Sequence, residues 1–183
     1  SSLTGATARI VEAVPIGRRI DTGTSDDRSR LGEAIHACIA ADLATPAKPL
    51  DMSEVASILK RMQAADDVDP AALHGQLGAL RSWLATRWPD TSPLIELPVS
   101  RGTAEGQQVQ GRTDLVLRTA TGWILMDHKS SPQGRDQWPD LANAYAGQLA
   151  AYRDVLQAAS GLPVEQIWLI LPVAGAALRV EVT

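Results

Sequence analysis

The sequence predicts an α/β (α+β) fold, with one mixed β-sheet flanked by helices and an N-terminal portion that is helical. Two observations support this prediction. Apolar residues recur at helical spacing over most of residues 28–88, whereas from residue 94 onwards the main period is two. The expected order is then helices, three strands, a helix and two strands, which fits one mixed sheet with flanking helices.

Three helices are expected in the N-terminal part, at residues 28–44, 52–65 and 70–88. Ser25, Asp26 or Asp27 can cap the first helix. Asp69 followed by Pro70 is typical of a cap and a first helical turn at the start of the third. The preceding residues, 1–27, are interpreted as a polar lead-in with one short apolar stretch.

Five strands are expected in the second half, at residues 94–100, 107–118, 122–129, 167–171 and 177–182, with a helix at 141–159. A turn at Thr119 to Gly122 should join the second and third strands into an antiparallel hairpin. Pro98 indicates that the first of these strands lies at a sheet edge or contains a bulge.

Composition favours a single globular domain over residues 1–183, with a mainly helical part at 1–90 and a sheet-containing part at 91–183. Hydrophobic residues make up 45% of the chain and charged residues 21%. No apolar run approaches the roughly 20 residues of a membrane helix, so no membrane partner is expected. Cys38 is the sole cysteine and cannot form an internal disulfide, which favours a cytoplasmic protein.

The end of the strand at 122–129 holds the most informative residues. Asp127 and Lys129 alternate along the strand and should share a face, while His128 points away. Asp114 lies on the partner strand of the predicted hairpin and can sit beside Asp127. Two adjacent carboxylates repel each other unless a divalent cation binds them. An ammonium group beside such a cation suits a phosphate ester.

One ordered set of residues covers nearly the whole chain and resembles the RecB-type branch of the PD-(D/E)XK nucleases: His36, Glu96, Asp114, Asp127, Lys129, Gln148 and Tyr152. The resemblance implies a restriction-endonuclease-like sheet and a metal-dependent deoxyribonuclease. Such domains are often fused to a helicase that processes double-strand breaks, as in AddA-like or RecB-like subunits. DNA, as a single-stranded end, and a helicase domain or subunit in cis or in trans are the implied partners.

The resemblance also implies roles for individual residues. Asp114, Asp127 and Lys129 would be catalytic, within residues 91–183. A Mg²⁺ or Mn²⁺ ion would be bound by His36, Asp114, Asp127 and the backbone carbonyl of His128. No iron–sulfur cluster is expected, because the relatives that carry one use several cysteines and this chain has one.

The remaining residues of the set would support the site or touch DNA. Gln148 and Tyr152 stand four residues apart on one helical face. Glu96 matches an acidic residue of the family's first strand. Basic residues near the set are candidate phosphate contacts: Arg112, Arg135 and Arg153.

Other interpretations stay open at this stage. His36 could be a core histidine, and the His74 and His128 side chains are interpreted as structural or exposed. Trp138 is the tryptophan to test for base stacking. The formal charge of −4 argues against binding nucleic acid by bulk electrostatics. The alternative functions are a degenerate, non-catalytic nuclease-like scaffold or DNA-binding module, and a hydrolase of small phosphate esters.

Overall fold

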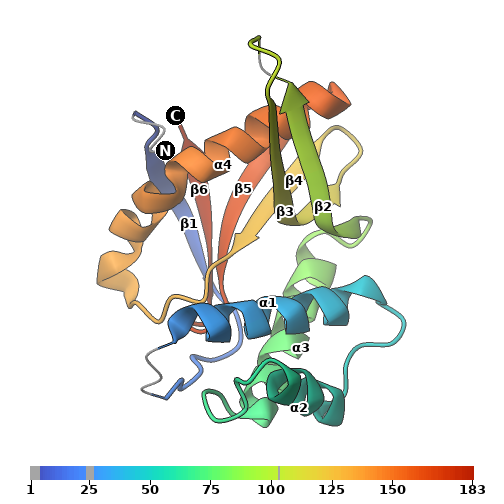
Figure 1. Cartoon of the computed structure of the whole chain (residues 1–183), viewed down its shortest axis with the longest axis vertical. Helices are drawn as coiled ribbons and strands as arrows, with labels where there is room; N and C mark the ends of the chain where they lie inside the picture. Colours follow the sequence, from blue (N-terminus) through green and yellow to red (C-terminus); the bar gives the residue numbers. More distant parts are fainter. Residues whose placement is uncertain (1–4, 24–26, 103) are drawn as a thin grey trace.

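A computed structural model of the chain describes residues 5–23, 27–102 and 104–183. Its elements, in chain order, are β1 (Ala8–Pro15), α1 (Arg28–Ala44), α2 (Met52–Arg61), α3 (Pro70–Arg87), β2 (Ser92–Gly102), β3 (Gln108–Arg118), β4 (Trp123–His128), the 3₁₀ turn η1 (Arg135–Gln137), α4 (Trp138–Ser160), β5 (Val164–Leu171) and β6 (Ala176–Val182). The strands form one sheet in the order β1-β6-β5-β4-β3-β2, flanked by helices (Figure 1). The predicted fold class is confirmed.

The sheet is mixed, because β4 and β5 are parallel and every other neighbouring pair is antiparallel. A parallel pair requires a long crossover. Helix α4 provides it and runs across one face of the sheet (Figure 1). The antiparallel pairing of β3 with β4 confirms the predicted hairpin. In the described part of the chain, no helix combines the length and the apolar character needed to cross a membrane.

Neighbouring residues of the central strands belong to two separate cores. Leu115 and Met126 pack in the core that includes residues of α1, α2 and α3. Val116 and Leu125 pack in the core that includes residues of α4. Because side chains alternate along a strand, Asp127 continues the α4 side of β4, and the residue after it continues the α1 side.

Caps define where the N-terminal helices begin. The side chain of Asp27 accepts a hydrogen bond from a backbone N–H in the first turn of α1. Of the three predicted caps, Ser25 and Asp26 lie outside the described residues. Helix α3 has Asp69 as its cap and Pro70 at its first position, as predicted.

Helix α2 ends at Arg61, earlier than the predicted end at residue 65. Gln63 has a φ of 59°, which is the left-handed region and cannot continue a right-handed helix. The apolar pattern alone does not reveal this change in the backbone.

Strand β1 is an element that the sequence interpretation did not include, since residues 1–27 were expected to be a polar lead-in. It pairs antiparallel with β6 at the edge of the sheet. Its register shifts between Ile10 and Glu12. Such a bulge breaks the alternation of apolar and polar residues by which a strand is detected in a sequence.

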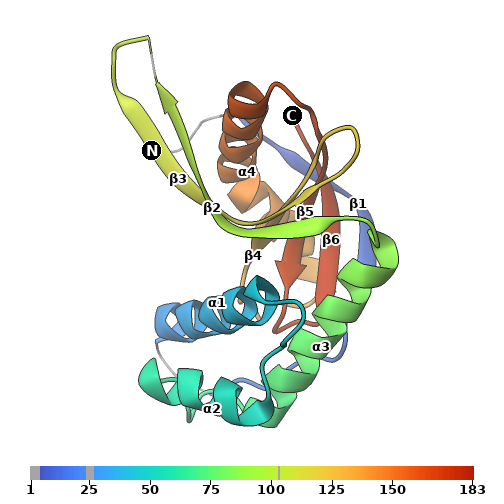
Figure 2. The same ribbon diagram turned by 90° about the vertical axis from the view of Figure 1, so that its right-hand side faces the viewer.

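Strand β2 is the other edge of the sheet, in agreement with the position of Pro98. It pairs with β3 from Ser92 to Gly102, whereas β3 pairs with β4 only from residue 115 to residue 118. The remaining part of β3 therefore leaves the sheet with β2 as a two-stranded arm, which extends beyond α4 (Figure 2). The point where β3 separates from β4 positions the candidate site.

Candidate active site

The two predicted acidic ligands lie where β3 and β4 separate. The last ladder pair joins Leu115 to Met126, so Asp114 and Asp127 are the next residue on each strand. Oδ2 of Asp114 accepts a hydrogen bond from the backbone N–H of His128 at 2.8 Å. The side chain of Asp114 thus bridges the gap that the diverging strands leave.

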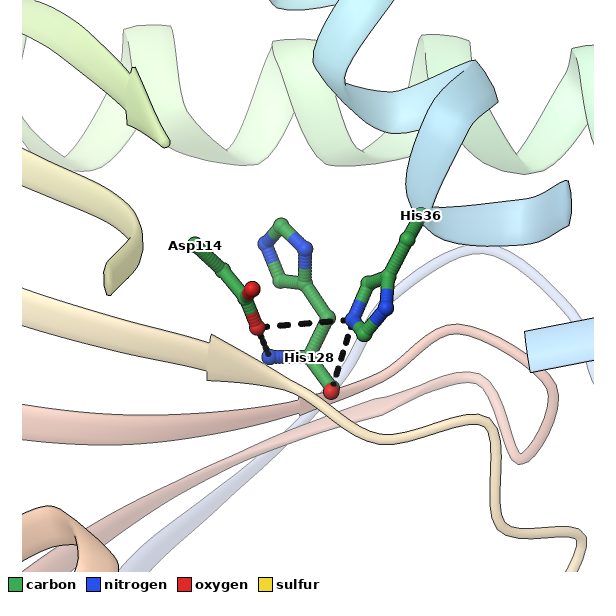
Figure 3. Close-up of side chains that lie close together, drawn as sticks. All are labelled: His36, Asp114 and His128. Atoms are coloured by element: carbon green, nitrogen blue, oxygen red, sulfur yellow. Dashed lines mark hydrogen bonds and ion pairs between the residues drawn. The ribbon is translucent and has the colours of Figure 1, made fainter. Parts of the chain in front are cut away.

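His36 reaches this gap from α1 (Figure 3). Helix α1 packs in the core on the side of the sheet opposite to α4. Nε2 of His36 lies 2.9 Å from the backbone oxygen of His128 and 3.4 Å from Oδ2 of Asp114. The structure therefore brings together three of the four predicted ligand positions, which come from α1, β3 and β4.

Asp127 and Lys129 point toward α4. Nζ of Lys129 lies 3.0 Å from Oδ2 of Asp127 and donates a hydrogen bond of 3.0 Å to Oε1 of Gln148. The same ammonium group lies 4.2 Å from the ring centroid of Tyr145. Nε2 of Gln148 in turn donates to the hydroxyl of Tyr152 at 3.2 Å. The predicted Gln-x-x-x-Tyr pair is thus connected to the lysine.

Burial and mutual contact control the charges of these groups. Burial raises the pKa of Asp127 to about 7; the neighbouring Asp114 adds to this effect and Lys129 opposes it. Burial alone would also raise the pKa of Asp114, but hydrogen bonding to His36 and the charge of nearby imidazoles hold it well below its usual range. The hydrogen bond with Asp114 raises the pKa of His36. The site therefore contains two neighbouring carboxyl groups of very different acidity.

The sequence analysis assigns a role only to the carbonyl of His128 and interprets its side chain as structural or exposed. The structure shows that the side chain is buried and lies beside His36 and Asp114. The imidazole is 3% exposed, and its ring centroid lies 5.6 Å from that of His36. Burial lowers its pKa to about 4. His36, Asp114 and His128 each offer one ligand atom, and these atoms lie within 4.8 Å of one another.

Glu96 lies opposite Asp114 between two regular ladder pairs of β2 and β3. Its φ of 51° is left-handed, an uncommon conformation for a non-glycine residue, and such conformations gather at functional sites. Glu96 lines a small cavity together with His36, Asp114 and the His128 side chain. Its carboxylate also lies 3.5 Å from the guanidinium of Arg112. These two exposed side chains form the rim of the site.

Other candidates are engaged elsewhere. The guanidinium of Arg153 donates to the backbone oxygen of Val182 at 2.8 Å. Arg135 lies against the ring of Trp138, at 5.2 Å from its centroid. Trp138 is buried, and its Nε1 donates to the backbone oxygen of Gln133 at 3.1 Å. Its position is that of a packing residue rather than an exposed base-stacking platform.

Comparisons with known proteins place this geometry in context. A family model described as "PD-(D/E)XK nuclease superfamily" matches residues 12–182. Among solved structures, "Crystal structure of SSO0001" has a TM-score of 0.38 and 16% identity, over 79% of this chain and 75% of that chain. "Crystal structure of protein VC1899 from Vibrio cholerae" has a TM-score of 0.33 and 12% identity, over 80% of this chain and 49% of that chain. No curated protein matches.

Proposed function

This chain belongs to the PD-(D/E)XK nuclease superfamily, and from that premise we propose that it is a Mg²⁺- or Mn²⁺-dependent deoxyribonuclease that hydrolyses phosphodiester bonds. One observation carries the proposal. Asp114 and Asp127 meet at the separation of β3 and β4, with His36 on one side and Lys129 on the other.

The residues present fit a divalent cation. Oδ2 of Asp127 is buried and makes no hydrogen bond of ordinary geometry with the described residues. It also lies beside a second carboxyl group, and a cation would relieve the repulsion between the two. We assign the ligands as His36 Nε2, the carboxylates of Asp114 and Asp127, and the carbonyl oxygen of His128. This donor set suits Mg²⁺ or Mn²⁺.

A cation bound by these ligands supplies Lewis-acid activation of water and neutralises charge on phosphate oxygens. Lys129 has a different task. Its side chain is 18% exposed, and its ammonium group contacts Gln148 and the ring of Tyr145, which hold it at the edge of the site. From there it orients the attacking water and stabilises the charge that develops on the phosphate.

Residues around the site are proposed to contact the DNA. Gln148 and Tyr152 occupy one face of α4, next to Lys129. Arg112 and Glu96 are exposed at the opposite rim. We propose that these four side chains contact the sugar-phosphate backbone on either side of the bond to be cut.

A helicase domain or subunit, in cis or in trans, is the partner that we propose. The chain has a formal charge of −4, so its own long-range attraction for DNA is weak. A motor that delivers a single-stranded end to the site would compensate for this, as in the processing of double-strand breaks. We propose a cytoplasmic location for such a complex.

The test is a cleavage assay on linear single-stranded DNA, duplex DNA and RNA, with and without Mg²⁺ or Mn²⁺. We expect metal-dependent cleavage of DNA. Asp127→Asn and Lys129→Ala should each reduce it at least about 100-fold, since each removes stabilisation of charge in the transition state. Circular dichroism should show that both variants keep the fold.

Asp90→Asn and Lys60→Ala are matched controls, because both residues are exposed and lie outside the site. They should retain full cleavage. Metal-dependent cleavage that is equal in the wild type and in both site variants would defeat the proposal. A chain that binds neither Mg²⁺ nor Mn²⁺ would instead support the alternative of a non-catalytic scaffold.

A further inference from the structure

We propose that the imidazole of His128, in place of its carbonyl oxygen, binds the cation together with His36 and Asp114, and that the site therefore prefers a transition-metal dication such as Mn²⁺ over Mg²⁺. This inference rests on the proposed function, because it concerns the same cation. The pattern of two aspartates and a lysine gives the His128 side chain no role.

The first observation is a buried nitrogen without a partner. His128 is 3% exposed, and its Nε2 makes no hydrogen bond with any residue that the structure describes. A buried polar atom without a hydrogen-bond partner is unfavourable for the folded protein. A ligand that binds this ring would provide that partner.

The second observation is the place of the ring. It projects from the end of β4 into the space between Asp114 and His36 (Figure 3). One ligand atom from each of these three residues lies within 4.8 Å of the others. Nitrogen ligands lie about 2.1 Å from a transition metal, so ligand atoms on opposite sides of the ion are about 4.2 Å apart. Small side-chain adjustments suffice to reach that spacing.

The third observation is the space beside the ring. A cavity of about 10 Å³ is lined by His36, Ala40, Glu96, Asp114 and His128. This volume is at the lower limit for one water molecule, and therefore also suits a single small ion. Two of the five lining residues, His36 and His128, carry imidazoles that can ligate a metal through nitrogen, and two, Glu96 and Asp114, carry carboxylates that would balance the charge.

His74 shows what a structural histidine looks like in this chain. It is partly buried, and its Nε2 pairs with the backbone oxygen of Leu50 at 3.1 Å. The ring of His128 has no equivalent contact for Nε2 and faces a second imidazole and a carboxylate instead. The difference between the two histidines is the reason for assigning a ligand to one of them.

The preference for Mn²⁺ follows from ligand chemistry. Mg²⁺ favours oxygen ligands and keeps several waters, whereas imidazole suits transition metals. A second imidazole therefore adds more to the affinity for Mn²⁺ than to the affinity for Mg²⁺. The ratio of the two affinities is the quantity that His128 should control.

Calorimetric titration with MnCl₂ and with MgCl₂ measures this ratio in the wild type, His128→Phe and the control His74→Gln. His128→Phe should weaken Mn²⁺ binding about tenfold or more, as expected for a lost ligand, and should change Mg²⁺ binding less than about threefold. His74→Gln should change neither. Equal losses for both ions, or no loss for Mn²⁺, would overturn the assignment.

Electron spin-echo spectroscopy of bound Mn²⁺ counts coordinated imidazoles directly and needs no variant. Two imidazole nitrogens in the wild type, and one in His128→Phe, are expected. One imidazole in the wild type would mean that water fills the cavity and that only the assignment of His128 fails. A wild type that binds no Mn²⁺ would overturn the proposed function together with this inference.

Discussion

Two buried aspartates, Asp42 in α1 and Asp127 near the end of β4, have very different surroundings. Asp42, in α1, is 1% exposed and is fully hydrogen bonded. Its Oδ1 accepts from the backbone N–H of Leu50 at 3.0 Å, and its Oδ2 accepts from the guanidinium of Arg81. Asp127 is 3% exposed, and its Oδ2 lies 3.0 Å from the ammonium of Lys129 but makes no hydrogen bond of ordinary geometry with the described residues.

The difference separates a carboxylate that holds the structure together from one that is available to a ligand. The contacts of Asp42 satisfy both of its oxygens, so a cation could bind it only by breaking them. Asp127 is buried without such contacts and lies next to Asp114, which is unfavourable in the protein alone. Local violations of this kind are expected at functional sites.

The largest effect is expected from Asp42→Ala. Breaking a buried ion pair leaves the guanidinium of Arg81 uncompensated, and costs about 3–5 kcal/mol of the free energy of unfolding. Asp127→Asn should cost far less, because it removes a buried charge with few contacts. Urea unfolding of the two variants measures both values. Comparable losses in the two would remove the distinction between these carboxylates.

The pH dependence of stability tests the same comparison. An unfolded aspartate titrates near pH 3.9, whereas burial raises the pKa of Asp127 to about 7. Between about pH 4 and pH 7 the folded state keeps a proton that the unfolded state loses. The contribution of this group to stability therefore falls as the pH rises, by at most about 4 kcal/mol.

Asp127→Asn should flatten this part of the curve of unfolding free energy against pH. Asp114 acts in a separate window, because its pKa is lowered: its contribution is present above about pH 4 and is lost on further acidification. Thermal or urea unfolding between pH 3 and pH 8 measures both. A slope between pH 4 and pH 7 that persists in Asp127→Asn would contradict the assignment to this residue.

A smaller effect, on the rate of cleavage, is expected from changing Gln148, whose side chain holds Lys129. Gln148→Ala leaves Lys129 with Asp127 but removes its hydrogen-bond acceptor on α4. Cleavage should fall about tenfold, with the Mn²⁺ affinity unchanged, because a supporting residue and not a ligand is lost.

The smallest effect is expected from Tyr152→Phe, which removes only the hydroxyl to which Gln148 donates. The rate should fall by about the free energy of one neutral hydrogen bond, roughly twofold to tenfold. Single-turnover cleavage rates compare the two variants. A loss in Tyr152→Phe that exceeds the loss in Gln148→Ala would mean that the hydroxyl contacts the DNA itself.

Most of the helices and strands could be predicted, because their apolar residues recur at the spacing typical of a helix or alternate as in a strand. The helix at 28–44 and the strand at 107–118 agree with α1 and β3 to within one residue. Strand β1 was not predicted, because its bulge breaks the alternation of apolar and polar residues. The end of α2 was misplaced because the left-handed backbone of Gln63 leaves no trace in the apolar pattern.

The arrangement of the candidate site could also be predicted only in part. The approach of Asp114 to Asp127 could be anticipated from the hairpin, since a turn fixes which residues of two strands lie together. The surroundings of the His128 side chain could not, because they depend on how α1 packs against the end of β4. Nor does the sequence indicate that Glu96, which is not a glycine, has a left-handed backbone.

The pairing of the first strand with the last has a consequence for how the chain folds. The backbones of Thr7 and Thr183 exchange two hydrogen bonds of 3.0 Å, so residues 176 positions apart close one edge of the sheet. During synthesis β1 emerges before β6 and has no partner in this sheet until β6 has left the ribosome. Pairings between residues far apart in the sequence slow folding, and we infer that β1 pairs with β6 late in folding.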